Sequence, residues 1–204
     1  MSLNLIAVIS IILIAIILIR KRCYSKEVNL GEQEVSNVLN KIKGYKLLND
    51  IMVKGNNGTS QIDHILIGKK GIFVIETKDY KGSIYGDEYS REWTQIINMK
   101  KNKFYNPIRQ NYGHIKSLEK HIKRNDVFIS LIVFTNKSKL KKVKTNTPVI
   151  QLKKLKRFIR KYKSDIKLSK VEIEDIYNLI KKSNINSARA RKKHVKRIIK
   201  NISL

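Results

Sequence analysis

Two short motifs, Q-I-D-H at residues 61–64 and E-T-K at residues 76–78, place charged side chains within apolar segments. In the segment I-F-V-I-E-T-K (72–78), alternation along a strand puts Glu76 and Lys78 on the same face as apolar residues. Burying charge is unfavourable unless the group is paired or bound to a metal ion. The pattern therefore predicts a buried strand whose charged end has a specific partner.

The preceding segment 59–67 is also typical of a strand and carries Asp63 among isoleucine and leucine. Lys69-Lys70-Gly71 predicts a tight turn between the two strands, because glycine accepts positive φ. Such a hairpin brings Asp63 close to Glu76. Two carboxylates with a lysine beside them suit Mg²⁺ and a phosphodiester substrate. The alternative is a structural acid–lysine pair at the end of a sheet.

Several separated motifs together resemble the nuclease-related domain (NERD) family, a bacterial branch of the PD-(D/E)XK nuclease superfamily. The resemblance covers roughly residues 27–135 and rests on motifs in the expected order. These are G-E (31–32), Q-I-D-H (61–64), G-I-F-V-I-E-T-K-D-Y-K-G (71–82), Trp93, F-Y-N-P-I-R-Q-N (104–111) and His114. It implies a phosphodiesterase site that uses Mg²⁺ or Mn²⁺, with Asp63, Glu76 and Glu32 as metal ligands and Lys78 as a catalytic group. Ile62 stands where the superfamily has proline.

Glu32 lies on the apolar stripe of a predicted helix over residues 28–43, where Val28, Val35 and Leu39 recur at helical spacing. A carboxylate on that stripe needs a metal ion, a lysine or a backbone donor. Its alternative is a first-turn glutamate favoured by the helix dipole.

A second helix is predicted over residues 107–123, since Asn106-Pro107 is a typical helix start. Gln110 and His114 lie four residues apart on one face of it. The resemblance implies that Gln110 orients the catalytic lysine or water. His114 is expected to be a helix-surface or packing residue, and a direct role in the site is the alternative. The chain has no Cys/His cluster with zinc-ligand spacing.

Residues 3–19 are apolar apart from Asn4 and Ser10 and are followed by Arg20-Lys21-Arg22. This order predicts an uncleaved membrane anchor, because a signal peptide has its positive charge before the apolar run. The positive-inside rule then predicts a single-pass protein of the cell membrane with its C-terminal domain in the cytoplasm. A buried core helix is the alternative. Cys23 is the single cysteine, which allows no internal disulfide.

The remaining pattern predicts strands at 45–53, near 82–86, at 92–98, at 127–135 and near 147–150, with two helices beyond. We therefore expect an α/β protein with a restriction-endonuclease-like core, in which helices flank a mixed central sheet. One N-terminal transmembrane helix precedes this core and a basic helical tail follows it. The predicted domains are residues 1–22 (anchor and basic flank), 27–150 (nuclease-related domain) and 151–204 (basic helical extension).

The chain has 44 Lys and Arg against 16 Asp and Glu, a formal net charge of +28. Such a field attracts nucleic acid or an anionic membrane surface. The tail 188–200 could contact either, and DNA is the preferred partner because the tail lacks Trp and Phe. Its predicted nucleic-acid-binding residues are Arg189, Arg191, Lys192, Lys193, Lys196 and Arg197.

Two functions remain open from the sequence. The first is a membrane-anchored, Mg²⁺-dependent nuclease that hydrolyses phosphodiester bonds, with DNA as the expected substrate. The second is a non-catalytic module that keeps the nuclease fold and binds nucleic acid or an anionic membrane. The presence of all four motif residues, Glu32, Asp63, Glu76 and Lys78, favours the first.

Overall fold

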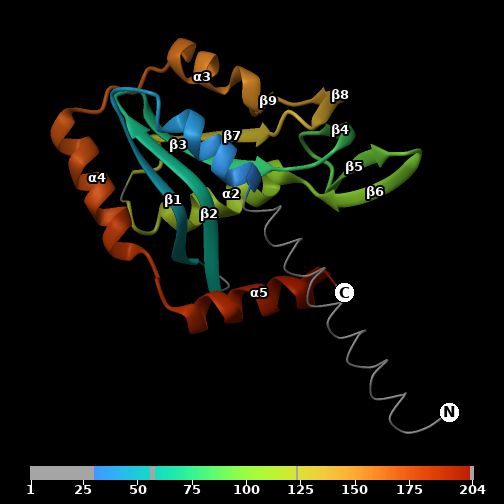
Figure 1. The fold of residues 1–204 in the computed structure, drawn as a ribbon. Helices are drawn as coiled ribbons and strands as arrows, with labels where there is room; N and C mark the ends of the chain where they lie inside the picture. The colour runs from blue at the N-terminus through green and yellow to red at the C-terminus, as the bar shows by residue number, and fades with distance from the viewer. Residues whose placement is uncertain (1–29, 56–57, 123, 203–204) are drawn as a thin grey trace, which may run out of the picture.

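A computed structural model describes residues 30–55, 58–122 and 124–202, which form a larger sheet flanked by helices and a smaller sheet beside it (Figure 1). The predicted anchor at residues 3–19 and its basic flank lie outside the described residues. In the ranges that are described, no helix is both long enough and apolar enough to cross a bilayer. The predicted nuclease-related domain and most of the C-terminal extension can therefore be compared with the structure.

The larger sheet carries the two acidic motifs on adjacent strands. Its strand order is β1-β2-β3-β7-β9, antiparallel from β1 to β3 and parallel from β3 to β9. The predicted turn is present, since Gly68 pairs with Gly71 and Gly71 has a φ of 114°. The strands are β1 (Tyr45–Gly55), β2 (Gly58–Gly68), β3 (Gly71–Lys78), β7 (Phe128–Phe134) and β9 (Val149–Gln151).

A second sheet, which the sequence did not predict as a separate unit, has the order β6-β5-β4-β8. Its strands are β4 (Gly82–Asp87), β5 (Glu92–Ile97), β6 (Lys100–Tyr105) and β8 (Ser138–Lys144). β6 and β8 were missed because at least half of the residues in each are lysines, which are depleted in strands. A turn at Asn98 and Met99, with φ of 47° and 62°, connects β5 to β6.

Helices cover both faces of the larger sheet. On one face, α2 (Pro107–Leu118) and α4 (Lys170–Ser183) pack in an apolar cluster with β1, β2 and β3. On the other, a helix over residues 30–39 and α3 (Leu152–Lys161) pack against the same sheet. α5 (Ala188–Ile202) lies beside the end of the β1–β2 hairpin (Figure 1).

The helix predicted over residues 107–123 ends at Leu118 in the structure. The apolar pattern continues further because Leu118 and Ile122 are both buried in the same cluster, although the chain between them has turned out of the helix. Burial and helical conformation therefore end at different residues.

A third apolar cluster joins the two sheets. Trp93 of β5 stacks on Phe134 of β7, with ring centroids 6.2 Å apart and the ring planes within 1°. Ile84, Ile108 and Ile132 complete its buried part. The smaller sheet is thereby fixed to the end of β7, next to the end of β3 where the motif E-T-K lies.

We predict that His64 makes the fold sensitive to acid. Its side chain is 1% exposed, and burial lowers its pKa from the ordinary 6.5 to about 4, although Glu76 opposes this. The unfolded chain therefore binds a proton more readily, so the stabilisation is complete above pH 6.5 and is lost as the pH falls towards 4. The loss should reach about 3 kcal/mol in urea unfolding.

The His64→Leu variant should lose that much less stability between pH 7 and pH 4 than the wild type. His121→Gln, a change at a partly exposed histidine, is the matched control and should follow the wild-type profile. Parallel pH profiles for the wild type and His64→Leu would contradict the assignment.

Candidate active site

The β2–β3 register places Asp63 and Glu76 on one face of the larger sheet. His64 pairs with Ile75, so the next position of the antiparallel ladder sets Asp63 opposite Glu76. The backbone N–H of Thr77 donates to Oδ2 of Asp63 at 2.8 Å. The hairpin therefore brings the two predicted carboxyl groups together, as their spacing in the sequence implied.

Glu76 is buried and holds two basic partners. Nζ of Lys78 donates to its Oε1 at 2.7 Å, and Nε2 of His114 lies 3.1 Å from its Oε2. Burial alone would raise the pKa of Glu76, but Lys78 and His114 outweigh burial and lower this pKa to about 2. Glu76 is therefore ionised at neutral pH in spite of its position.

Lys78 is positioned from two directions. Besides Glu76, its ammonium group donates to Oε1 of Gln110 at 2.9 Å. Burial would lower the pKa of Lys78, but the charge of Glu76 and other neighbours raises it above the ordinary value. The structure thus joins Lys78 to Gln110, the contact that the family resemblance implied.

Two buried asparagines fix α2 so that Gln110 and His114 face the sheet. Oδ1 of Asn106 accepts from the N–H of Ile108 at 2.9 Å and caps the helix, as predicted. The Asn106 amide group also donates to three carbonyls, those of Asp87 at the end of β4 and of Glu88 and Ser90 in the loop that follows. Asn111 donates to the carbonyl of Val74 and to Oγ of Ser130, both at 2.8 Å.

His114 contacts the candidate site directly, which was the less expected of its two possible roles. Its Nδ1 lies 2.7 Å from Oγ of Ser60 on β2, while its Nε2 faces Glu76. Its four-residue spacing from Gln110 was the available signal, since both side chains project from one helical face. A histidine at that spacing is also compatible with packing alone, which is why this contact was not expected.

Glu32 approaches the site because the helix over residues 30–39 packs tightly against the end of β3. A Cβ atom on Gly31 would lie 2.6 Å from Cβ of Asp79, so this approach requires glycine. Asp79 is itself held by Thr135 and Lys137. Burial, with the charges of Asp50 and Glu76, raises the pKa of Glu32, and Lys78 opposes this shift.

The carboxyl groups repel one another. Burial is the largest cause that raises the pKa of Asp63 well above its ordinary value, and the charges of Glu76 and Glu32 add to it. The Thr77 N–H and Lys78 act in the opposite direction without outweighing these causes. A divalent cation would offset this repulsion, so the oxygen donors of Asp63, Glu76 and Glu32 fit such an ion chemically.

Among the described residues, no three His, Cys, Asp or Glu side chains are already grouped closely enough to form a metal site. The three carboxyl groups therefore influence one another electrostatically without forming a complete ligand cage. The structure brings the predicted residues Asp63, Glu76, Lys78 and Gln110 into one network and sets Glu32 at its border.

The predicted nucleic-acid-binding residues of α5 fall into two groups. Arg191 donates to both carboxylate oxygens of Asp50 at 2.7 and 2.8 Å, and Arg197 contacts Thr59 and His194. These two arginines attach α5 to the β1–β2 hairpin. The other members of the set are exposed and consist of Arg189, Lys192, Lys193 and Lys196.

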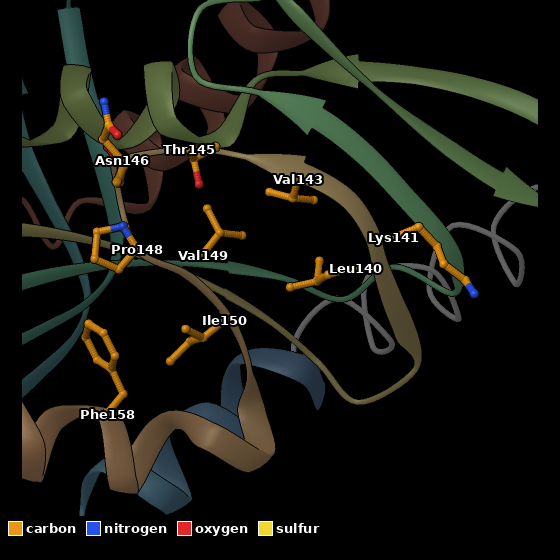
Figure 2. A pocket seen from close by; sticks show the side chains of 10 residues that line it. Leu140, Lys141, Val143, Thr145, Asn146, Pro148, Val149, Ile150 and Phe158 are labelled. Carbon is orange, nitrogen blue, oxygen red and sulfur yellow. The ribbon is translucent and has the colours of Figure 1, made fainter.

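A surface hollow lies between β8, the loop after it and α3 (Figure 2). Its lining is mainly aliphatic, aromatic and small polar, with Lys141 as its charged member and no carboxylate. Phosphodiester chemistry needs acids and a cation together, so the Glu76–Lys78 network is the candidate active site and this hollow is not.

Comparison with known proteins identifies the family. The nuclease-related domain matches residues 27–135, which include every residue of the network just described. The chain therefore belongs to the nuclease-related domain family. An uncharacterized protein of Bacillus anthracis is 38% identical over 200 residues, covering 93% of this chain and 94% of that protein.

A crystal structure of a protein of unknown function is also similar, at 12% sequence identity and a TM-score of 0.36. It covers 84% of this chain and 99% of the other chain. At that TM-score the similarity supports no argument about fold or function.

Proposed function

We propose that this protein is a nuclease that hydrolyses phosphodiester bonds, with DNA as its substrate and Mg²⁺ or Mn²⁺ as its cofactor. The observation that carries the proposal is the Lys78 ammonium group, which is held between Glu76 and Gln110 beside the half-buried carboxyl of Asp63. A structural ion pair at a sheet end would need neither the second acid nor the glutamine.

Each polar residue of the network has a task in this proposal. Lys78 places a fixed positive charge where negative charge develops on the phosphate in the transition state. The hydrogen bond to Gln110 fixes the orientation of the Lys78 ammonium group, and His114 contacts the second carboxylate oxygen of Glu76. The hydrogen bond from Thr77 fixes the Asp63 carboxyl.

Asp63, Glu76 and Glu32 would hold the metal ion. Mg²⁺ bound there would supply charge neutralisation on the phosphodiester and a water of lowered pKa. Each oxygen of Glu76 has a second lone pair, so its contacts with Lys78 and His114 still allow it to be a ligand.

Substitution of the network residues should strongly slow cleavage while the protein still folds. Asp63→Asn, Glu76→Gln and Lys78→Ala should each lower the rate of plasmid cleavage in Mg²⁺ by about a hundredfold or more, as expected for loss of one electrostatic catalytic group. Lys69→Ala, a change at an exposed lysine of the β2–β3 turn, is the matched control and should cleave at the wild-type rate.

Cleavage by Lys78→Ala at the wild-type rate would contradict the assignment. A wild-type protein that binds DNA but never cleaves it, in Mg²⁺ or in Mn²⁺, would favour the non-catalytic module instead. Circular dichroism of each variant separates lost chemistry from lost folding.

The four exposed cations of α5 are proposed to contact DNA phosphates. Arg189, Lys192, Lys193 and Lys196 remain accessible while Arg191 and Arg197 hold the helix on the hairpin. α5 lies against β2, the strand that carries Asp63, so phosphates bound there would belong to the same substrate molecule.

We also propose that residues 3–19 anchor the protein in the cell membrane with the nuclease-related domain in the cytoplasm. The uncharged apolar run followed by Arg20-Lys21-Arg22 supports this orientation. The protein should stay in the membrane fraction after a carbonate wash, and protease added to intact spheroplasts should leave the domain whole. Digestion of the domain from outside would contradict the orientation.

A further inference from the structure

The smaller sheet has one buried face and one face covered by lysines. Ile84, Trp93 and Phe104 point into the third apolar cluster, together with Leu140 and Val143 of β8. Alternation along the strands turns their neighbours to the opposite face. The border strands β6 and β8 place five exposed lysines on that opposite face: Lys101, Lys103, Lys139, Lys142 and Lys144.

The register shows that these lysines form two rows, and the residues between the rows are polar and aromatic, with the aliphatic Ile96 and the acidic Asp87 among them. Lys101 and Lys103 lie opposite Ile96 and Thr94 of β5. Lys139 and Lys142 lie opposite Ser83 and Tyr85 of β4, and Lys144 lies opposite Asp87. The rows are three strand spacings apart, or about 14 Å. We call these five lysines and the residues between them the lysine face.

The lysine face carries more positive than negative charge. Among the described residues, none of the five ammonium groups takes part in an ion pair. Two carboxylates lie on the same face: Asp87, which accepts from the N–H groups of Tyr89 and Ser90, and the exposed Glu92 of β5. The lysines outnumber these acids, so the face attracts a polyanion.

Two short chain segments connect the strands of the lysine face to residues of the candidate active site. β4 begins at Gly82, four residues after Lys78, so their Cα atoms are at most about 14 Å apart. β6 ends at Tyr105, next to the Asn106 cap of the helix that carries Gln110. Along a duplex, about four phosphates of one strand span that distance, at 3.4 Å each.

We propose that the lysine face binds the phosphate backbone of the nucleic-acid substrate to one side of the bond that is cleaved. This inference rests on the proposed nuclease function, because it extends the substrate-binding surface of that site. Tyr85 and Thr94 lie between the rows, and Tyr105 is 50% exposed at the border. These polar and aromatic groups favour a nucleic acid over a bilayer, which would require an apolar surface to be buried.

The test is binding of fluorescent duplex and single-stranded DNA to the full chain in neutral detergent with EDTA, where cleavage does not interfere. The variant Lys101→Gln/Lys103→Gln/Lys142→Gln/Lys144→Gln should bind at least about tenfold more weakly at moderate salt. The slope of log affinity against log salt should become shallower by about 0.9 for each duplex phosphate contact that is lost.

The matched control removes the same amount of charge from α3 through Lys153→Gln/Lys154→Gln/Lys156→Gln/Lys161→Gln, all at exposed positions. It should keep the affinity and the salt slope close to wild type. An equal loss in both variants would overturn the proposal, because binding would then follow net charge alone.

Two further outcomes would also overturn the proposal. The first is wild-type DNA binding by the β6–β8 variant with lost binding to anionic vesicles, which would assign the face to a membrane. The second is unchanged DNA binding with new self-association in light scattering, which would mean that the lysines only block edge-to-edge strand pairing. Because binding is measured without cleavage, failure of the nuclease proposal would leave these results interpretable.

Discussion

The buried Glu76–Lys78 ion pair is the interaction on which the rest of the site depends. The two side chains are 3% and 15% exposed, and removal of one would leave the other as an uncompensated charge in a low-dielectric environment. Gln110 accepts a second hydrogen bond from Lys78, and His114 contacts the second carboxylate oxygen of Glu76. α2 must therefore lie across the end of β3, and Asn106 and Asn111 hold it there.

Acidic and basic residues occupy separate regions around the Glu76–Lys78 pair. Acids gather at the junction of β2, β3 and the helix over residues 30–39, where burial and mutual repulsion raise the pKa of Asp63 and of Glu32. Lysines occupy the border strands of the smaller sheet and the exposed face of α5. An acidic centre with basic surroundings suits a substrate with a polyanionic backbone and a cationic cofactor.

Much of the fold and of the candidate site was predictable from the sequence because apolar periodicity was strong there. The β2–β3 hairpin followed from alternation and Gly71, and the start of α2 followed from Asn106-Pro107. Those elements brought Asp63, Glu76, Lys78 and Gln110 together. β6 and β8 were not predictable in the same way. Their many lysines obscure the alternation of apolar and polar residues, and these strands are stabilised by pairing with β5 and β4.

The roles of individual cations also depended on tertiary contacts. Arg191 and Arg197 were grouped with the other basic residues of the tail, since nothing local distinguishes them. Their contacts are with Asp50 and Thr59, more than a hundred residues away in the sequence. Asp50 has a positive φ of 52° within β1, a conformation that its neighbours do not indicate. The spacing of His114 from Gln110 was visible in the sequence, but its contact with Glu76 was not.

The proposed divalent-cation site of Asp63, Glu76 and Glu32 is tested most directly by the thermal unfolding of the full chain with and without Mg²⁺ at constant ionic strength. A ligand that binds only the folded state at about a hundred times its Kd adds about 2.7 kcal/mol, which corresponds to a rise in Tm of roughly 5–10 °C. The wild type should show this rise. Asp63→Asn should show a higher Tm than the wild type without Mg²⁺, because a disfavoured charge is removed, and no further rise when Mg²⁺ is added. An identical Mg²⁺-dependent rise in both proteins, or none in the wild type, would contradict the account.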